Sequence, residues 1–340
     1  LFENYKKDTY IIDSKCSRFG SGEAKGTIYE SIRGKDLYFI VDVTNYNVKY
    51  KLCGYENRMS PDDHYSDLKR LIAAAAGKAR RINVIMPFLY ESRQHKRTSR
   101  ESLDCAVALQ ELKSIGVDNI ITFDAHDPRV QNAIPLSGFE SIQPNYQFIK
   151  ALFNSVDDLI VDSDHMMMIS PDEGAMSRVV YYANVLGIDM GMFYKRRDYS
   201  TVVNGRNPIV AHEFLGASVE GKDVIIIDDM ISSGESMLDT ARELKKRKAK
   251  RVFVASTFGL FTNGLESFDK AYEEGVISKI LTTNCIYQTP ELLSKPYYVN
   301  VDMSKYVALL IESLNHDRSI SELLDPSDKI HRLLKKYNNR

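Results

Sequence analysis

The sequence predicts an α/β protein made of two similar domains, each a mainly parallel sheet flanked by helices. Its 340 residues are enough for about two domains with a core each. Short apolar runs alternate with helix-like runs, which is typical of parallel sheets covered by helices. A second series of strands begins near Met166, after a helix predicted over residues 146–153. We therefore place the domains at residues 1–143 and 144–325, followed by a tail at 326–340.

The predicted strands are short, apolar segments rich in Ile, Val, Phe and Met. In chain order they are residues 37–43, 82–87, 119–123, 166–170, 190–194, 224–227, 251–256 and 279–283. Helix signals lie between them. Ser60, Pro61 and Asp63 form a capping pattern at the start of a helix. This helix is predicted to continue to Ala76, and another one ends at Gly116.

Charge and cysteine content exclude several classes of protein. Basic residues number 45 and acidic residues 46, so the net charge of −1 creates no overall field for nucleic acid or a membrane. No apolar run reaches the ~18 residues of a membrane span, and no signal peptide is visible. The 4 cysteines lack a CxxC pair, which argues against a zinc site or disulfide framework and indicates a reduced, cytoplasmic protein. The charged segment 329–340 predicts a surface helix that frays.

The most informative segment is 224–237, where an apolar strand ends in two aspartates and a small, hydroxyl-rich turn. The turn opens a predicted helix, whose N-terminus offers free N–H groups and a positive dipole end to a phosphate. Asp228 and Asp229 follow the strand, where carboxylates accept hydrogen bonds from sugar hydroxyls. The segment therefore predicts a ribose phosphate site, with an acidic pair that caps a helix as the alternative. The turn residues are Ser232, Ser233, Gly234, Glu235 and Ser236.

Two other strand ends carry groups that bind metals. His126 and Asp172 each follow an apolar strand, at the edge of a sheet where ligands bind. Mg²⁺ often takes only one or two protein groups, because water and substrate phosphates fill its other positions, so a sparse pair suits it. Histidine is an unusual Mg²⁺ ligand. Spacing alone therefore leaves open that His126 is a structural or substrate-contacting residue.

Two basic loops also follow predicted strands. Residues 90–100 include four positive side chains, and the turn 194–198 contains Lys195 and Arg197. Such cations can neutralise a polyphosphate or stabilise charge that develops in phosphoryl transfer, although solvated charged loops are common. The polar segment 200–208 has the composition of a loop that closes over a substrate.

The glycine-rich stretch 18–36 predicts a hairpin near the start of the chain. Phe19 is an exposed aromatic candidate there, and its ring can stack on a base. The stretch lacks the GxxxxGK[ST] order, and no P-loop is present elsewhere in the sequence. Binding of ATP would therefore require another architecture.

Taken in order, these segments resemble the ribose-phosphate diphosphokinases, also called phosphoribosyl pyrophosphate synthetases. The family's Phe-x-Asn-x-Glu loop corresponds to Phe19, Ser21 and Glu23, and its Glu-Ser-Ile-Arg-Gly-x-Asp segment corresponds to residues 30–36. Further matches are the ATP loop at Tyr90, Arg93, Gln94 and Lys96, the Asp124-Ala-His126 segment, the segment from Ser170 to Gly174, and Lys195 with Arg197. The resemblance covers residues 16–325 and implies two domains with the fold of type I phosphoribosyltransferases.

The resemblance also implies a reaction. The C1 hydroxyl of ribose 5-phosphate would attack the β-phosphorus of MgATP in line, taking up pyrophosphate and releasing AMP. The implied ATP-binding residues are Phe19, Ser21, Glu23, Arg93, Gln94 and Lys96. The residues implied to bind Mg²⁺ are His126 and Asp172. For ribose 5-phosphate they are Asp228, Asp229, Ser232, Ser233, Gly234, Glu235 and Ser236. Lys195 and Arg197 would stabilise the transition state. Because Phe19 and Glu23 would reach a neighbouring subunit's nucleotide, the resemblance implies a dimer-based homo-oligomer, up to a hexamer.

Residues 45–59 lengthen the region before the helix at Ser60, Phe258 stands where the family usually has a histidine, and two further departures lie in the substrate loops. Ser21 replaces an asparagine, and the usual Asp-Thr-x-Gly-Thr turn is Ser-Ser-Gly-Glu-Ser here, which places Glu235 beside the phosphate. We expect the Glu235 side chain to point outward, so that only its N–H faces the ligand. The departures leave open a noncatalytic regulatory relative that assembles with active subunits. A phosphoribosyltransferase, the other alternative, would share the turn but needs no second domain with an ATP loop.

Overall fold

The computed structural model describes residues 10–197 and 209–338, and for residues 195–197 and 209–212 it describes the backbone alone. The chain divides into two compact units. The first contains the residues up to Gln143 together with Cys285–Tyr287, and the second contains Pro144–Asn284 and the residues from Gln288 onward. Within the described ranges, no helix is long and apolar enough to cross a membrane.

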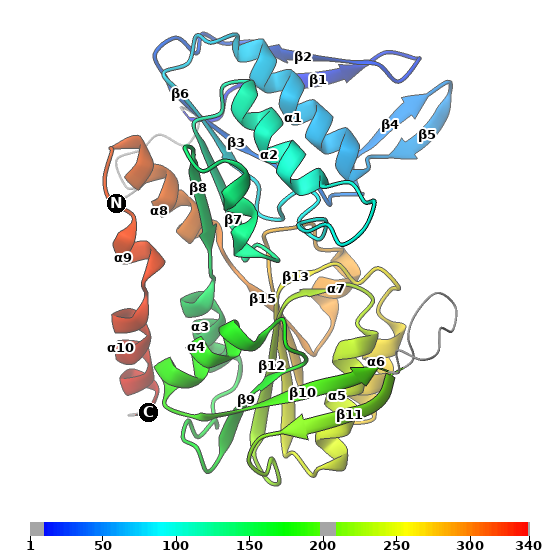
Figure 1. Cartoon of the computed structure of the whole chain (residues 1–340), viewed down its shortest axis with the longest axis vertical. Coiled ribbons are helices and arrows are strands. Elements are labelled where there is room, and N and C mark those ends of the chain that lie inside the picture. The colour runs from blue at the N-terminus through cyan, green and yellow to red at the C-terminus, as the bar shows by residue number, and fades with distance from the viewer. Residues whose placement is uncertain (1–9, 198–208, 339–340) are drawn as a thin grey trace. The chain divides into compact units, whose positions relative to one another are not determined.

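The first unit is built on a four-stranded parallel sheet with the order β3-β6-β7-β8 (Figure 1). The strands are β3 (Asp36–Ile40), β6 (Arg81–Ile85), β7 (Asn119–Phe123) and β8 (Gly138–Ile142), and the helices are α1 (Pro61–Ala75), α2 (Asp104–Ser114) and the 3-10 helix η1 (Pro128–Ala133). Two antiparallel hairpins join β1 (Ser14–Arg18) to β2 (Ala24–Ile28) and β4 (Lys49–Leu52) to β5 (Tyr55–Arg58). The β1–β2 hairpin confirms the prediction for the glycine-rich stretch, whereas β4–β5 has no counterpart among the predicted elements.

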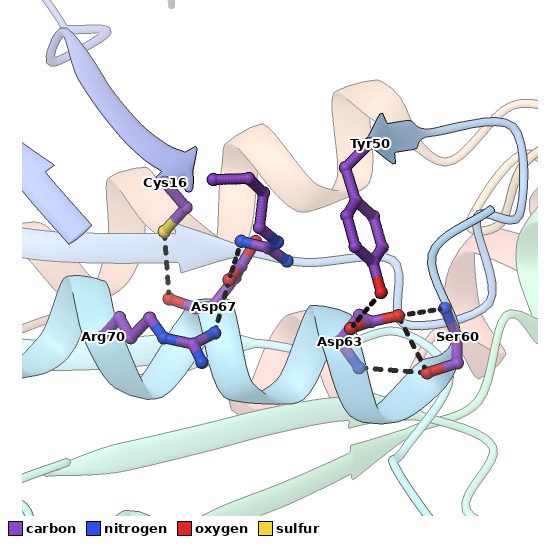
Figure 2. Close-up of polar contacts among 7 residues, drawn as sticks. Cys16, Tyr50, Ser60, Asp63, Asp67 and Arg70 are labelled. Carbon is purple, nitrogen blue, oxygen red and sulfur yellow. Dashed lines mark hydrogen bonds and ion pairs between the residues drawn. The ribbon is translucent and has the colours of Figure 1, made fainter. Parts of the chain in front are cut away.

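The capping pattern predicted at the start of α1 is formed (Figure 2). The Ser60 hydroxyl accepts a hydrogen bond from the Asp63 N–H at 3.2 Å, and the Asp63 carboxylate accepts one from the Ser60 N–H at 2.9 Å. Two orphan donors of the first turn are thereby satisfied. One turn further on, Asp67 binds both Arg18 of β1 and Arg70 of α1, at 2.7 and 2.8 Å. These contacts hold the β1–β2 hairpin against α1.

The second unit contains a seven-stranded sheet with the order β11-β10-β9-β12-β13-β14-β15. Its strands are β9 (Met166–Ser170), β10 (Asp189–Arg197), β11 (Ile209–Leu215), β12 (Asp223–Ile231), β13 (Arg251–Gly259), β14 (Lys279–Thr283) and β15 (Tyr298–Val301). All neighbouring pairs are parallel except β10 and β11, so β11 is an antiparallel edge strand. The predicted α/β class with mainly parallel sheets is confirmed.

Helices cover both faces of this sheet, and this explains why its central strands are continuously apolar. The helices of the second unit are α3 (Asn145–Ser155), α4 (Met176–Leu186), α5 (Glu235–Lys246), α6 (Glu266–Glu273), α7 (Pro290–Ser294), α8 (Ser304–Asn315), α9 (Ser321–Leu324) and α10 (Ser327–Asn338), of which α3, α4 and α10 pack on one face of the sheet and α5 and α6 on the other. Along β12, Ile225 and Ile227 pack in one core with α3, α4 and α10. Val224 and Ile226 point the other way, into a core with α5 and α6. Alternate residues of one strand thus supply two cores.

Five of the predicted strands have different bounds in the structure, most of all β12, and the C-terminal helix differs from the prediction in its packing. Strand β12 runs four residues beyond the predicted end at Ile227, because its ladder with β13 continues to Ile231 opposite Gly259. The C-terminal helix α10 is not a fraying surface helix. Its Ile330 is completely buried, and the buried Tyr337 hydroxyl donates to the Val156 carbonyl at 2.7 Å. The charged composition of the segment concealed an apolar face that docks on α3.

Candidate functional site

The turn between β12 and α5 requires a glycine. Gly234 is the N-cap of α5 and has a φ of 88°, in the left-handed region that favours glycine. A Cβ atom at this position would lie 2.0 Å from Cζ of Phe268, which is completely buried in α6. The backbone of the turn therefore packs directly on an aromatic ring. No other residue type fits this position without rearrangement.

The N-terminus of α5 follows directly after this turn. No side chain in the described part of the chain caps the helix, and the Glu235 N–H makes only a long contact of 3.5 Å to the Ser233 hydroxyl. The turn is held from behind, where the Ser232 carbonyl accepts a hydrogen bond from the Thr262 N–H at 3.0 Å. Glu235 and Ser236 are exposed. The helix dipole and the N–H groups thus offer the chemistry of a phosphate site.

Acidic residues converge beside this turn. Asp229 is buried, Asp228 is half-buried, and the Asp229 N–H donates to the Asp228 carboxylate at 2.9 Å. Burial raises the pKa of Asp228 well above its usual value, and the charges of Asp229 and Asp172 raise it further. The nearby charge of Arg178 opposes this increase. Asp172 therefore lies close enough to Asp228 to act on its ionisation.

Asp172 reaches this position from the strand beside β12. Strand β9 pairs with β12 and ends at Ser170, so Asp172 lies at the carboxyl edge of the sheet. Its carboxylate accepts a hydrogen bond from the Gly174 N–H at 2.9 Å, and its carbonyl accepts one from the Ser170 hydroxyl at 2.6 Å. The tight turn fixes the direction of the carboxylate.

In the first unit, His126 is exposed just after β7. The chain turns sharply before it, since Asp124 has a φ of 43° and its carboxylate accepts a hydrogen bond from the Gln143 amide at 3.0 Å. The ring of His95 lies edge-on to that of His126, with 5.3 Å between centroids. Nε2 of His95 lies 3.5 Å from Asp127. His95 thus connects the basic loop to the segment that carries His126.

The basic loop after β6 has a packed base and exposed cations. The Tyr90 ring stacks on that of Tyr65 with 4.3 Å between centroids. Gln94 donates from its side chain to the Ser102 carbonyl at 2.5 Å. Arg93 and Lys96 are exposed, as is the greater part of this loop. The stacked tyrosines hold the loop, while its cations remain accessible to a polyphosphate.

The tip of the β1–β2 hairpin presents an aromatic ring to solvent. Phe19 is 57% exposed, and its N–H donates to the Glu23 carbonyl at 2.8 Å. The Ser21 hydroxyl donates to the Glu23 carboxylate, also at 2.8 Å. Ser21 therefore fixes Glu23 within the tip, and the exposed Phe19 ring is available to a ligand or another chain.

The predicted transition-state residues lie at the end of β10. Lys195 is paired with His212 of β11, and a register shift occurs between Arg196 and Arg197. The side chains of Lys195 and Arg197 lie outside the described atoms, as does the whole of the predicted closing loop at 200–208.

The structure brings some predicted residues together within a unit. Asp172, Asp228 and the phosphate turn share one sheet edge in the second unit, whereas His126 lies with the basic loop in the first. Three residues were missed from the sequence. His95 adjoins Gln94 in the basic loop, Asp127 follows His126, and Arg178 lies on the helix after Asp172. Proximity in sequence was the signal available for each.

Metal binding here depends on few protein groups. Among the described residues, no cluster of three or more His, Cys, Asp or Glu side chains is arranged to hold an ion. Asp172 and Asp228 nevertheless repel one another, and a divalent cation relieves such repulsion. Oxygen donors of this kind fit Mg²⁺ better than a transition metal.

Comparison with known proteins finds a matching domain family for each of the two parts of the chain. A model of the N-terminal domain of ribose phosphate pyrophosphokinase matches residues 5–116, and a phosphoribosyl transferase domain model matches residues 139–293. Ribose-phosphate pyrophosphokinase of Vibrio cholerae is 28% identical over 319 residues, which cover 92% of this chain and 91% of the relative. That of Mycoplasma genitalium is 27% identical over 332 residues, covering 96% and 91%.

A solved structure shows the same fold. The crystal structure of phosphoribosylpyrophosphate synthetase from Mycobacterium smegmatis superimposes with a TM-score of 0.74 at 21% identity. The match covers 90% of this chain and 91% of that one. Its extent agrees with the two domain matches, which follow one another along the chain. The chain therefore belongs to the ribose-phosphate pyrophosphokinase family, a family of transferases.

Proposed function

We propose that this chain transfers pyrophosphate from MgATP to the C1 hydroxyl of ribose 5-phosphate, giving 5-phosphoribosyl 1-diphosphate and AMP. The observation that carries the proposal is the edge of the second sheet, where Asp228 and Asp229 precede an uncapped helix N-terminus. Relatives named for this activity match more than nine-tenths of the chain, 92% in the case of Vibrio cholerae.

Ribose 5-phosphate is bound by the β12–α5 segment in this proposal. Its phosphate contacts the N–H groups and hydroxyls of Ser232, Ser233, Gly234, Glu235 and Ser236. Asp228 and Asp229 accept hydrogen bonds from the ribose hydroxyls. Such bonds favour ionised Asp228, which burial and neighbouring carboxylates disfavour in the free protein. The exposure of Glu235 supports a site in which its N–H, and not its carboxylate, faces the sugar phosphate.

ATP is bound by the loops of the first unit. Arg93, Gln94 and Lys96 contact its phosphates and sugar, and the exposure of Arg93 and Lys96 supports this role. Phe19, Ser21 and Glu23 contact the adenine of a neighbouring subunit, so the active form is a homo-oligomer. The 57% exposed ring of Phe19 is consistent with a partner that covers it.

Mg²⁺ is held by His126 and Asp172, together with water and the substrate phosphates. When bound, it draws charge from the pyrophosphoryl group that is transferred. Lys195 and Arg197 neutralise the charge that develops on the transferred oxygens, and the remaining residues orient the sugar for in-line attack. Little covalent chemistry is required of the protein.

The direct test is to incubate the purified protein with ATP, Mg²⁺ and ribose 5-phosphate and to identify the nucleotide product by chromatography. AMP that forms only when the sugar phosphate is present supports the proposal. ATP binding without AMP, over a range of phosphate concentrations, would instead indicate the noncatalytic regulatory relative. Reaction of the sugar without consumption of ATP would indicate a different transferase.

Lys195→Ala tests the transition-state role. We expect kcat to fall by about 10²–10³-fold, because one charge-stabilising group is lost, while the affinity for ATP changes little. Lys270→Ala, on the exposed side of α6, is the matched control and is expected to leave both constants unchanged. A parallel loss of ATP binding, measured by equilibrium titration, would show that Lys195 acts in the ground state instead.

A further inference from the structure

A basic groove lies between α3 and α10 in the second unit, whose helices lie side by side (Figure 1). Its volume is about 480 Å³, within the range of roughly 300–1,000 Å³ found for small-molecule sites. Lys329, Arg332 and Lys336 line it from one face of α10, at helical spacing. Lys150 and Asn154 line it from α3.

The groove has a packed floor. The Phe153 and Tyr337 rings stack with 4.3 Å between centroids, and both side chains are buried. The Tyr337 hydroxyl also accepts a hydrogen bond from the Leu159 N–H at 3.1 Å. Ile330 places a third buried side chain under α10. The cations therefore project from a docked helix and not from a loose tail.

The four cations of the groove have no acidic partner in it. No carboxylate lines the groove, and in the described part of the chain none of the four forms an ion pair. The Arg332 guanidinium donates only to the Asp328 carbonyl, at 3.2 Å. The charge of Lys150 acts on Asp302, but that carboxylate already accepts hydrogen bonds from Asn284 and Ser304.

Helix stability does not account for this arrangement. Lys329 lies in the first turn of α10, where the helix dipole disfavours a positive charge. Arg332 lies three residues from Lys329 and four from Lys336, and like charges at these spacings repel one another. Lys336 lies in the last turn, where the dipole favours a positive charge, but the repulsion between neighbouring cations remains, and a bound anion would relieve it.

We propose that the α3–α10 groove binds a small polyanion that carries two or more phosphate groups. Several phosphates match several cations, and a guanidinium binds phosphate through paired hydrogen bonds. The partly buried Tyr146 and Leu333 add apolar surface at the rim. Helix α10 lies beyond both matched domains, which end at residues 116 and 293, whereas α3 lies within the second. None of the residues that line the groove is among the substrate-binding residues proposed above.

The test is hydrogen–deuterium exchange of the full chain, titrated with inorganic tripolyphosphate at low salt. We expect slower exchange in peptides covering residues 145–155 and 327–338, with a saturable midpoint that rises with added salt. Arg332→Glu with Lys336→Glu is expected to raise the midpoint about a hundredfold or more, the scale of losing two charge-assisted bonds. Lys305→Glu with Lys335→Glu changes the net charge equally outside the groove and is expected to preserve the midpoint.

ATP serves as a second probe. It carries a phosphate chain attached to adenosine, whereas tripolyphosphate is the phosphate chain alone, so the two probes distinguish a nucleotide from an inorganic polyphosphate as the ligand. Protection of α10 by both probes identifies the phosphate chain as the ligand, and protection by ATP alone shows that the apolar rim also contributes. The proposal is overturned if neither probe protects α10, or if the charge-reversed variant is protected equally. If charge reversal unfolds the chain, Arg332→Gln with Lys336→Gln provides the same comparison.

Discussion

At the scale of single residues, the predicted phosphate turn depends on the absence of a side chain at residue 234. Gly234 allows the backbone to lie against the Phe268 ring, and this contact sets the direction of the first N–H groups of α5. The same aromatic ring also packs edge-on against Phe261, with 5.1 Å between centroids. The proposed position of the phosphate is therefore linked to the packing of α6.

Gly234→Ala is expected to lower the free energy of unfolding by about 3 kcal/mol or more, because the added methyl group meets Phe268 and φ is positive. The matched control is Gly275→Ala, whose φ of 69° is also positive but whose Cβ would meet no atom within 4 Å. It is expected to cost about 1 kcal/mol. Urea unfolding measures both changes, and equal losses would show that strain alone matters at Gly234.

Single residues also mark the limit of the sequence prediction. Asp228, Asp229 and the turn are contiguous, so one segment predicted them together. The effect of Asp172 on Asp228 depends on β9 pairing with β12, although β10 and β11 intervene in the chain. His95 was overlooked because its role depends on a contact with Asp127 that no local pattern encodes.

At the scale of elements, the interior strands and the edge strand β3 were predicted, and every strand that was missed from the two main sheets lies at an edge. Strands β7, β9 and β14 have the predicted bounds. The missed strands of the two main sheets are β8, β11 and β15, and each lies at a sheet edge. An edge strand pairs on one side only and is partly exposed, so it lacks the continuous apolar run of a strand covered on both faces.

The start of β3 is held by charge. Asp36 is paired with Arg81 at the start of β6, and its carboxylate accepts a hydrogen bond from Nε of Arg80 at 2.7 Å and one from Arg81 at 2.5 Å. The bond from Arg80, and then that from Arg81, lower the pKa of Asp36 from 3.8 to about 2. Because the folded-state pKa is the lower one, ionised Asp36 stabilises the fold above about pH 4, and this is lost as the pH falls to about 2.

Asp36→Asn removes this pH dependence. Between about pH 5 and about pH 2, the free energy of unfolding of the wild-type protein is expected to fall by about 1 kcal/mol more than that of the variant, after allowance for solvent screening at the exposed Arg80. Urea unfolding at several pH values measures both. If the free energies of unfolding of the two proteins change equally with pH over this range, the ion pairs of Asp36 contribute nothing to stability.

At the scale of the whole molecule, the proposed oligomer makes a prediction. If Phe19 contacts the nucleotide in a neighbouring subunit's site, then mixing the subunits of inactive Phe19→Ala and Lys195→Ala proteins is expected to restore activity. Roughly a quarter of the sites in a 1:1 mixture of dimers would be intact. AMP formation by the mixture measures the recovery. No recovery in mixed oligomers, identified by native mass spectrometry, would place Phe19 and Lys195 in the same subunit's site.

The segment Cys285–Tyr287 belongs to the first unit although the chain around it belongs to the second. The Tyr287 N–H donates to the Asp42 carboxylate at 2.6 Å, and the Tyr287 ring lies edge-on to Tyr46. A ribosome releases the first sheet long before it makes this segment. Asp42 accepts hydrogen bonds from Thr44 through Oδ1, but its Oδ2 gains the Tyr287 partner only after most of the later part has emerged. Truncated products that end before Cys285 carry an unfinished first unit, which quality-control proteases can recognise.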